Sequence, residues 1–206
     1  MLSIILAIAG SYLIGSIPTS YIIGRIVKGI DIREYGSGNI GATNLMRSVG
    51  KIPGIIALIL DVGKGLLPVI FIAGLFYSEA FFISEPLFKV ILGISSVCGH
   101  IWTIFLRFKG GKGVATTIGV LLGLAPIVTS IGLLIWLIVV LISRYVSLGS
   151  IIMAVSLPLL MMILRRPIEY TLLSAILCVF ISYKHKQNIR RLIDGTEYKI
   201  GRKIKK

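Results

Sequence analysis

Three polar stretches of this sequence carry residue types that can bind phosphate or move a proton. The first, "YGSGNIGATNLMR" at 35–47, combines glycines, hydroxyls and amides and closes on Arg47. Glycines let backbone N–H groups converge on an anion, and an arginine fork binds phosphate through paired donors. Taken alone, the stretch is equally well explained as a flexible connection with Gly and Asn at turn positions.

The second stretch, "RFKGGKGVATT" at 107–117, places a lysine among glycines just before an apolar run. Its spacing does not match G-x-x-x-x-G-K-[ST] after a strand, so ATP binding by that motif is excluded. A helix that starts after Gly113 would still offer free N–H groups to an anion. Lys112 would add charge, and Thr116 and Thr117 would lie in the first turns. The alternative is a turn whose lysines only follow the positive-inside rule.

The third stretch begins "HKQNIRRLIDGTE" at 185. His185 and Asn188 are three residues apart and would share a helix face. Because the unperturbed pKa of histidine is close to neutral, His185 could accept or donate a proton; it could equally be a solvated residue at the membrane surface. Attraction to anionic lipid head groups explains the surrounding lysines and arginines.

Three more ionisable residues lie within apolar runs. Asp61 and Lys64 could mark function, but a structural i, i+3 pair is the simpler interpretation. His100 is interpreted as a core or interfacial histidine. The H-x-x-x-x-D pattern of many glycerolipid acyltransferases is absent, because Phe105 follows His100 at that spacing and Arg190 follows His185.

Composition and charge indicate a membrane protein. The chain is 56% hydrophobic with mean hydropathy +0.97, above the usual composition of soluble domains. The net charge of +14 comes mostly from loops between apolar runs, which favours positive-inside topology over nucleic-acid binding. Cys98 and Cys178 lie inside apolar runs without a disulfide or metal pattern. We expect no metal, no cofactor and no nucleic-acid partner.

The apolar runs predict an all-α integral membrane protein with seven transmembrane helices, forming one domain over 1–206. The short run at 113–125 can cross only if the glycine loop before it dips into the membrane, since irregular backbone at that depth must be buried in protein or line a cavity. Most basic residues then fall on one side, which puts the N-terminus outside and the basic tail, 184–206, in the cytoplasm. We expect the first span to be retained, because no basic region precedes it. The expected spans are 2–24, 52–77, 87–106, 113–125, 127–143, 149–164 and 168–183.

Together, "SGNIGATN" with its following arginine, "KGGKGVAT" and "HKQNIRRLIDGTE" resemble the bacterial acyl-phosphate:glycerol-3-phosphate acyltransferase family (PlsY). The resemblance covers nearly the whole chain and includes "GSIP", "LDVGKG" and "RYVSL". It implies a seven-span enzyme of the bacterial inner membrane with a cytoplasmic active site. Such an enzyme transfers a fatty acyl group from acyl phosphate to the 1-position of sn-glycerol 3-phosphate, in phospholipid synthesis.

The resemblance also implies roles for particular residues. Ser37 and Arg47 are expected to be needed for activity, Lys112 to bind substrate phosphate, and His185 and Asn188 to be catalytic or orienting. Further candidates for substrate binding are Gly38, Asn39, Gly41, Thr43, Asn44, Gly110, Gly111, Gly113, Thr116, Ser147 and Ser150, and the candidate structural residues are Asp61, Lys64 and Glu197.

The residues support direct transfer between two phosphate-bearing substrates, acyl phosphate and glycerol 3-phosphate. The base stays open between His185 and the donor's own phosphate, and we expect a monomer embedded in membrane lipid. The main alternative is a transporter of a phosphorylated or anionic solute, which glycine-broken helices with buried charge also fit. A transporter should show related halves and a site near the midplane, whereas these stretches fall on one predicted face. A structural or lipid-scrambling protein would not need all three.

Overall fold

The computed structural model describes residues 2–200 of the chain, and every regular element in that part is helical. The tail from 201 onwards lies outside the described residues. The helices divide into two compact units, one formed by residues up to Val120 and the other starting at Leu121. Each unit is described by itself below. The expectation of a single membrane domain stays a prediction.

The first unit contains ten elements of the described chain, the last of which continues into the second unit. These are α1 (Leu2–Ser16), α2 (Thr19–Lys28), η1 (Ile32–Glu34), α3 (Ala42–Ser48), α4 (Lys51–Leu67), η2 (Pro68–Ile72, a π-helical stretch), α5 (Ala73–Phe76), α6 (Glu85–Ile101), η3 (Ile104–Leu106) and α7 (Val114–Leu124). The second unit contains α8 (Pro126–Ser143), α9 (Val146–Ile163), α10 (Ile168–Lys184) and α11 (Lys186–Ile193).

Five helical stretches of the described chain are long and apolar enough to cross a membrane. They are Leu2–Lys28, Lys51–Phe76, Glu85–Leu106, Pro126–Ser143 and Val146–Ile163. Two further helices are shorter: α7 has 11 residues and α10 has 17. At 1.5 Å per residue, α7 covers only about 16 Å of a hydrocarbon core of about 30 Å. The seven-span topology and the orientation of the termini therefore stay predictions.

The first span is broken between α1 and α2 at Ile17 and Pro18. Proline has no N–H and its ring excludes the preceding carbonyls from helical bonding, so it interrupts the helix. The carbonyls released by the break are bonded by side chains from elsewhere in the unit. Thr103 Oγ1 donates to the carbonyl of Ser16 at 2.5 Å, and Lys64 Nζ donates to the carbonyl of Ile17 at 2.9 Å.

Small residues let the helices of the first unit approach closely, as is usual between helices in membranes. A side chain at Gly15 would collide with the backbone of Ser96 on α6, and one at Gly65 of α4 would collide with the carbonyl of Thr116 on α7. Gly119 of α7 in turn faces the carbonyl of Val62. These contacts fix the first turn of α7, and with it the lysine loop that precedes it.

The first polar stretch is not a loop throughout: its second half forms α3, which packs on α4. Ile32, Ile40 and Leu45 are buried in one hydrophobic cluster, and Leu106 of η3 belongs to the same cluster. Because η3 leads into the glycine–lysine loop, this cluster holds the first and second polar stretches side by side within one unit.

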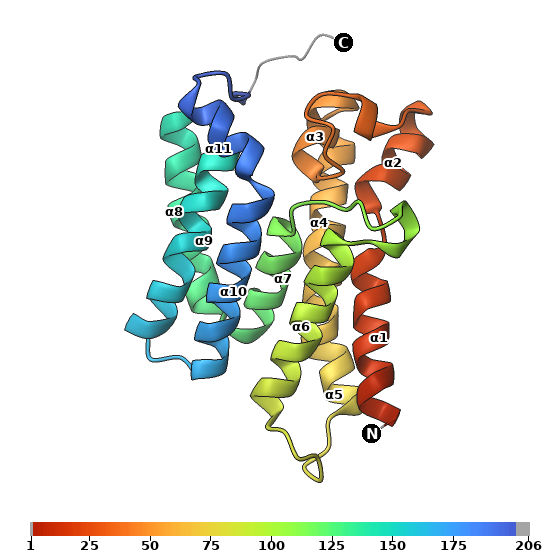
Figure 1. Ribbon diagram of the computed structural model, residues 1–206, viewed down its shortest axis with the longest axis vertical. Helices are drawn as coiled ribbons and strands as arrows, with labels where there is room; N and C mark the ends of the chain where they lie inside the picture. The colour runs from red at the N-terminus through yellow and green to blue at the C-terminus, as the bar shows by residue number, and fades with distance from the viewer. Residues whose placement is uncertain (1, 201–206) are drawn as a thin grey trace. The chain divides into compact units, whose positions relative to one another are not determined.

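In the second unit, α9 packs against α8, α10 and α11 (Figure 1). Gly149 allows α9 to lie against Trp136 of α8. Beyond α11 the chain turns at Gly195, whose φ is +68°, and runs back to the turn between α8 and α9. There the N–H of Ile200 donates to the carbonyl of Arg144 at 2.9 Å. The described part of the tail is thus tied to the helices and is not a free extension.

Candidate active site

The amide of Asn44 organises the first polar stretch. Its Oδ1 accepts the N–H of Ser37 at 3.0 Å. Its Nδ2 lies 2.9–3.0 Å from the carbonyl oxygens of Ile32, Tyr35 and Asn39. The side chain is 2% exposed, so both ends of the amide are used to shape the chain around Ser37. The predicted substrate-binding role of Asn44 is therefore indirect in this geometry.

The remaining candidates of this stretch are more open. Ser37 and Arg47 are half-buried, as are Asn39, Gly41 and Thr43, and Gly38 is exposed. Gly36 and Gly38 have φ of +59° and +68°, and the Asn44 amide oxygen occupies the space where a side chain at Gly36 would lie. Arg47 is in the last turn of α3. The short helix thus carries the arginine, and the turn just ahead of it carries the serine hydroxyl.

Asp31 anchors the chain just ahead of this turn. Its carboxylate accepts from Arg33 Nη2 at 2.6 Å and from the backbone N–H of Arg33 at 3.0 Å. The Arg33 hydrogen bonds lower the pKa of the Asp31 carboxyl to about 2, against the opposing effect of burial. Asp31 therefore stays ionised at any physiological pH.

The glycine–lysine loop is built differently from the sequence-based expectation. The N–H groups of Gly110 and Gly111 donate to the carbonyls of Ile101 and His100 at the end of α6, each at 3.0 Å. These two N–H groups therefore hold the loop and do not face an anion. The donors that remain are those of the first turn of α7, which have no intrahelical acceptor, together with the half-buried Lys112.

Gly113 turns the chain into α7 with φ of +82°. The candidate Thr116 and its neighbour Thr117 are fully buried, and their hydroxyl oxygens have no hydrogen-bond partner within the described residues. Thr116 is also the residue whose carbonyl packs on Gly65. A hydroxyl in that position is enclosed by the helices. The N–H of Thr117 donates to the carbonyl of Gly113 at 2.8 Å, so the N–H groups of the first turn that lack an intrahelical acceptor are those of residues 114–116.

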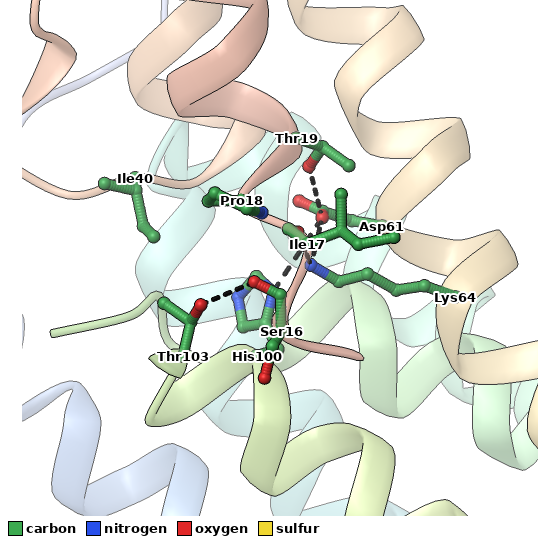
Figure 2. A pocket seen from close by; sticks show the side chains of 9 residues that line it. All are labelled: Ser16, Ile17, Pro18, Thr19, Ile40, Asp61, Lys64, His100 and Thr103. Atoms are coloured by element: carbon green, nitrogen blue, oxygen red, sulfur yellow. Dashed lines mark hydrogen bonds and ion pairs between the residues drawn. The ribbon is translucent and has the colours of Figure 1, made fainter. Parts of the chain in front are cut away.

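Beneath these two stretches lies a buried polar network (Figure 2). Asp61 Oδ1 is 2.8 Å from Lys64 Nζ and accepts the Thr19 hydroxyl at 2.6 Å. His100 Nδ1 is 3.8 Å from the same oxygen. Figure 2 shows these side chains converging from α2, α4 and α6. The expected i, i+3 pair therefore exists, and it belongs to a larger group.

In the second unit, Glu197 joins the third polar stretch to α9. Its Oε1 accepts from Ser147 Oγ at 2.8 Å and from Asn188 Nδ2 at 2.7 Å, and its Oε2 accepts from Arg191 Nε at 2.8 Å. Burial raises the pKa of the Glu197 carboxyl, but the hydrogen bonds from Arg191, Asn188 and Ser147 outweigh it and leave that pKa below its ordinary value. The carboxylate stays charged and fixes the amide of Asn188.

The histidine of this stretch has a defined tautomer. His185 Nδ1 lies 2.8 Å from the carbonyl oxygen of Ile181. Since a carbonyl only accepts, Nδ1 carries the hydrogen, and Nε2 of the neutral ring keeps its lone pair. His185 caps the start of α11 and is 3% exposed. Nearby, Ser150 donates to the carbonyl of Val146 at 2.9 Å and accepts the indole N–H of Trp136 at 3.4 Å.

The sequence did not indicate several residues that hold these candidates. The sequence explains Arg191 as one of the cations that attract anionic lipid, yet it binds Glu197 across the turn at 194–196. Thr19 carried no signal, because its partner Asp61 is 42 positions away. The sequence indicates a core or interfacial histidine at His100, and its burial favours the core, but its contacts with the glycine loop depend on how the chain folds back after α6.

Comparisons with known proteins agree on one family. Residues 5–195 match the sequence profile described as glycerol-3-phosphate acyltransferase. A protein of Desulforamulus reducens with the same description is 46% identical over 97% of this chain and 96% of its own length. Two crystal structures of PlsY (YgiH), an integral membrane glycerol 3-phosphate acyltransferase, match with TM-scores of 0.89 and 0.86, at 36% and 35% identity. Both alignments cover 97% of this chain and 96% of the PlsY chain. One crystal structure is the glycerol 3-phosphate form, and the other is the lysophosphatidic acid form.

Proposed function

The chain belongs to the glycerol-3-phosphate acyltransferase family, and we propose that it uses an acyl phosphate as its donor. As a member of that family it acylates glycerol 3-phosphate in phospholipid synthesis. The proposed reaction places the acyl group on the 1-hydroxyl and yields 1-acyl-sn-glycerol 3-phosphate and phosphate. The observation that carries the choice of donor is the pair of cations, Arg47 and Lys112, on two polar stretches held side by side in the first unit.

An acyl phosphate donor brings a second phosphate next to that of glycerol 3-phosphate. Like charges repel strongly in a site sheltered from water, so two cations and several oriented N–H groups are needed to bring the substrates together. Arg47 offers a planar fork on α3, while Lys112 is a point charge just before the open N–H groups of α7. A donor with a single remote phosphate would need only one of the two.

In the proposed mechanism the 1-hydroxyl oxygen attacks the carbonyl carbon of the donor. The carbonyl–phosphate bond breaks, and phosphate leaves with the bonding electrons. The hydroxyl proton goes either to Nε2 of His185 or to a donor phosphate oxygen. The Nδ1 hydrogen bond to Ile181 supports the first route, because it directs the basic lone pair away from the α10 backbone. Ser37 is a candidate donor to the developing oxyanion.

The transfer is proposed to be direct, without an acyl-enzyme. Ser37 is the serine of the first motif, and its bond to Asn44 is made by its backbone N–H and not by its hydroxyl, whereas a nucleophilic serine is normally activated by a base bonded to the hydroxyl. Mass spectrometry of the protein incubated with acyl phosphate alone should therefore show no acyl adduct at Ser37. A stable adduct that glycerol 3-phosphate then discharges would refute direct transfer.

The donor is tested by supplying purified protein with glycerol 3-phosphate and one acyl donor at a time. Acyl phosphate should give lysophosphatidate and inorganic phosphate in equal amounts. Acyl-CoA and acyl carrier protein with the same chain should give neither product. Turnover with a thioester donor but not with acyl phosphate would refute the proposed donor while leaving the family assignment intact.

Lys112 has a natural control in its own loop, because Lys109 is exposed three residues earlier. Lys112→Ala should reduce turnover roughly 100- to 1000-fold, the usual cost of losing one donor to developing charge, and the protein should stay folded in detergent. Lys109→Ala should retain near-normal turnover. Equal effects of the two substitutions would mean that the loop acts through net charge and is not a specific phosphate site.

We further propose seven spans in the bacterial inner membrane, with a monomeric enzyme whose active site faces the cytoplasm. The distribution of basic residues supports this orientation. Single cysteines introduced at Ser78, in the loop between α5 and α6, and at Asp194, beyond α11, would test it in a variant without native cysteines. A membrane-impermeant maleimide should label position 78 in intact spheroplasts and position 194 only after permeabilisation. The reverse pattern would invert the topology.

A further inference from the structure

The buried network of Asp61, Lys64, Thr19 and His100 has no role in the proposed chemistry. Ionisable side chains inside a membrane span nevertheless cost free energy. Asp61 and Lys64 are 1% and 5% exposed. The carboxylate is shared by the ammonium of Lys64, the hydroxyl of Thr19 and, at 3.8 Å, the imidazole Nδ1 of His100. Polar groups from α2, α4 and α6 thus surround one oxygen atom, Oδ1 of Asp61.

His100 connects this network to the glycine–lysine loop in two ways. Its carbonyl accepts the N–H of Gly111 at 3.0 Å, and the next carbonyl, that of Ile101, accepts the N–H of Gly110. In addition, a side chain at Gly111 would collide with Nε2 of the His100 ring. The imidazole therefore packs directly against the loop at Gly111. Gly111 must lack a side chain because the ring occupies that space.

The orientation of the ring follows from its two neighbours. Nδ1 lies toward the Asp61 carboxylate, and the opposite edge, with Nε2, lies against Gly111 (Figure 2 shows the Asp61 side). Lys64 and Thr19 hold the carboxylate in place from the other directions. A displacement of Asp61 would therefore be transmitted through the ring to Gly111, and Lys112 is the next residue along the chain.

We propose that His100 is a positioning residue for the glycine–lysine loop and that Asp61 sets its orientation. The inference rests on the proposed function in one respect, namely that this loop binds a substrate phosphate. His100 does not touch substrate in this proposal. It fixes the backbone at Gly111, so that Lys112 and the first turn of α7 are held at a constant distance from the bound phosphate.

His100→Ala tests the proposal, with Tyr12→Phe as the matched control. Tyr12 donates its hydroxyl to the carbonyl of Trp102 at 2.6 Å, so the control also removes one interaction at the end of α6 without touching the loop. His100→Ala should raise the KM of one or both phosphate-bearing substrates roughly tenfold or more, since small misplacements carry large kinetic costs. Its Tm should stay within a few degrees of that of Tyr12→Phe. Unchanged KM values for both substrates would overturn the proposal.

A double-mutant cycle separates positioning from general damage and does not depend on the fold of His100→Ala alone. Gly111→Ala pushes a methyl group onto the intact ring and should raise the same KM. In the double variant His100→Ala/Gly111→Ala the collision is gone, so the effects should not add. Additive effects, or a normal KM for Gly111→Ala, would show that ring and loop are not coupled.

The outcome is distinguishable from a failure of the proposed donor. If the wild-type protein is inactive with acyl phosphate, the donor proposal fails, and the same variants can be measured with whichever donor supports turnover. If the wild type is active and the KM values of the variants are normal, only the positioning role fails.

Discussion

Glu197→Gln is the most informative single substitution, because one carboxylate accepts from three donors of the second unit, one on α9 and two on α11. Glutamine keeps the shape of the side chain but can accept at only one oxygen. If the amide oxygen faces Ser147 and Asn188, the amide nitrogen meets the donor of Arg191, whose Nε now lies 2.8 Å from a carboxylate oxygen. The reverse orientation loses the other two bonds.

The expected cost can be worked from these contacts. Glu197 is 7% exposed, so its hydrogen bonds are sheltered from water, and a bond to a charged group contributes about 1.5–3 kcal/mol. Losing one such bond and leaving the Arg191 charge without its partner should cost about 2–4 kcal/mol. At roughly 2–4 °C per kcal/mol for a chain of this size, Tm should fall by about 4–16 °C.

The assay is thermal unfolding in one detergent, with Asp194→Asn as control, because Asp194 is an exposed carboxylate three residues earlier. That control makes the same change of charge and should shift Tm very little. Activity should also fall in Glu197→Gln, since the amide of Asn188 loses its anchor. The reasoning is refuted if Glu197→Gln and Asp194→Asn have the same Tm.

The same substitution has a signature in pH. The folded pKa of Glu197 lies below its ordinary value of 4.5, so the carboxylate stabilises the fold above that value. This stabilisation is lost as the pH falls through the folded pKa. Wild-type Tm should therefore drop on acidification below about pH 4.5, and the part of that drop due to Glu197 should be missing in Glu197→Gln.

Three further substitutions test the first polar stretch. Asn44→Asp turns a donor toward three carbonyl oxygens into an acceptor and should lower activity at least tenfold, together with Tm. Gly36→Ala, at φ +59° and against the Asn44 amide, should lower Tm by several degrees, whereas Gly63→Ala, with open space around it, should not. Asp31→Asn should remove an acid-sensitive contribution to the free energy of unfolding. With the pKa of Asp31 at about 2, its pairing with Arg33 is complete above the ordinary value of 3.8 and is lost between pH 4 and 2. The Tm values of wild type and variant should therefore converge at the acid end.

The sequence predicted the helical class and the membrane character, because both follow from composition and long apolar runs. It also predicted the Asp61–Lys64 pair, since i, i+3 spacing on a helix brings two side chains together. It did not predict α3, because a helix of seven residues is too short to show a 3.6-residue period. Thr43, Asn44 and Arg47 therefore lie on a helix where a loop was expected.

The inner arrangement of the candidate site could not be predicted for a different reason: its contacts join distant parts of the chain. The glycine-rich loop at 110–113 suggests four free backbone N–H groups, but those of Gly110 and Gly111 are bonded to carbonyls at the end of α6. The carboxylate of Glu197 finds Ser147 across 50 positions. No local pattern encodes such distances, which arise only when the helices pack and the chain turns back at Gly195.

The break at Ile17–Pro18 has a consequence for how the protein is made. Helices of a membrane protein emerge from the ribosome in chain order, yet the broken end of the first helix is completed by groups 47 and 87 positions later, Lys64 and Thr103. The carbonyl of Ile17 also accepts the N–H of Thr19 at 3.0 Å, but until Thr103 arrives the carbonyl of Ser16 must be solvated by something other than this protein. A nascent chain halted before Thr103 would therefore carry an unsatisfied carbonyl at Ser16 in its first span, and the partner of that carbonyl is made only with the third span.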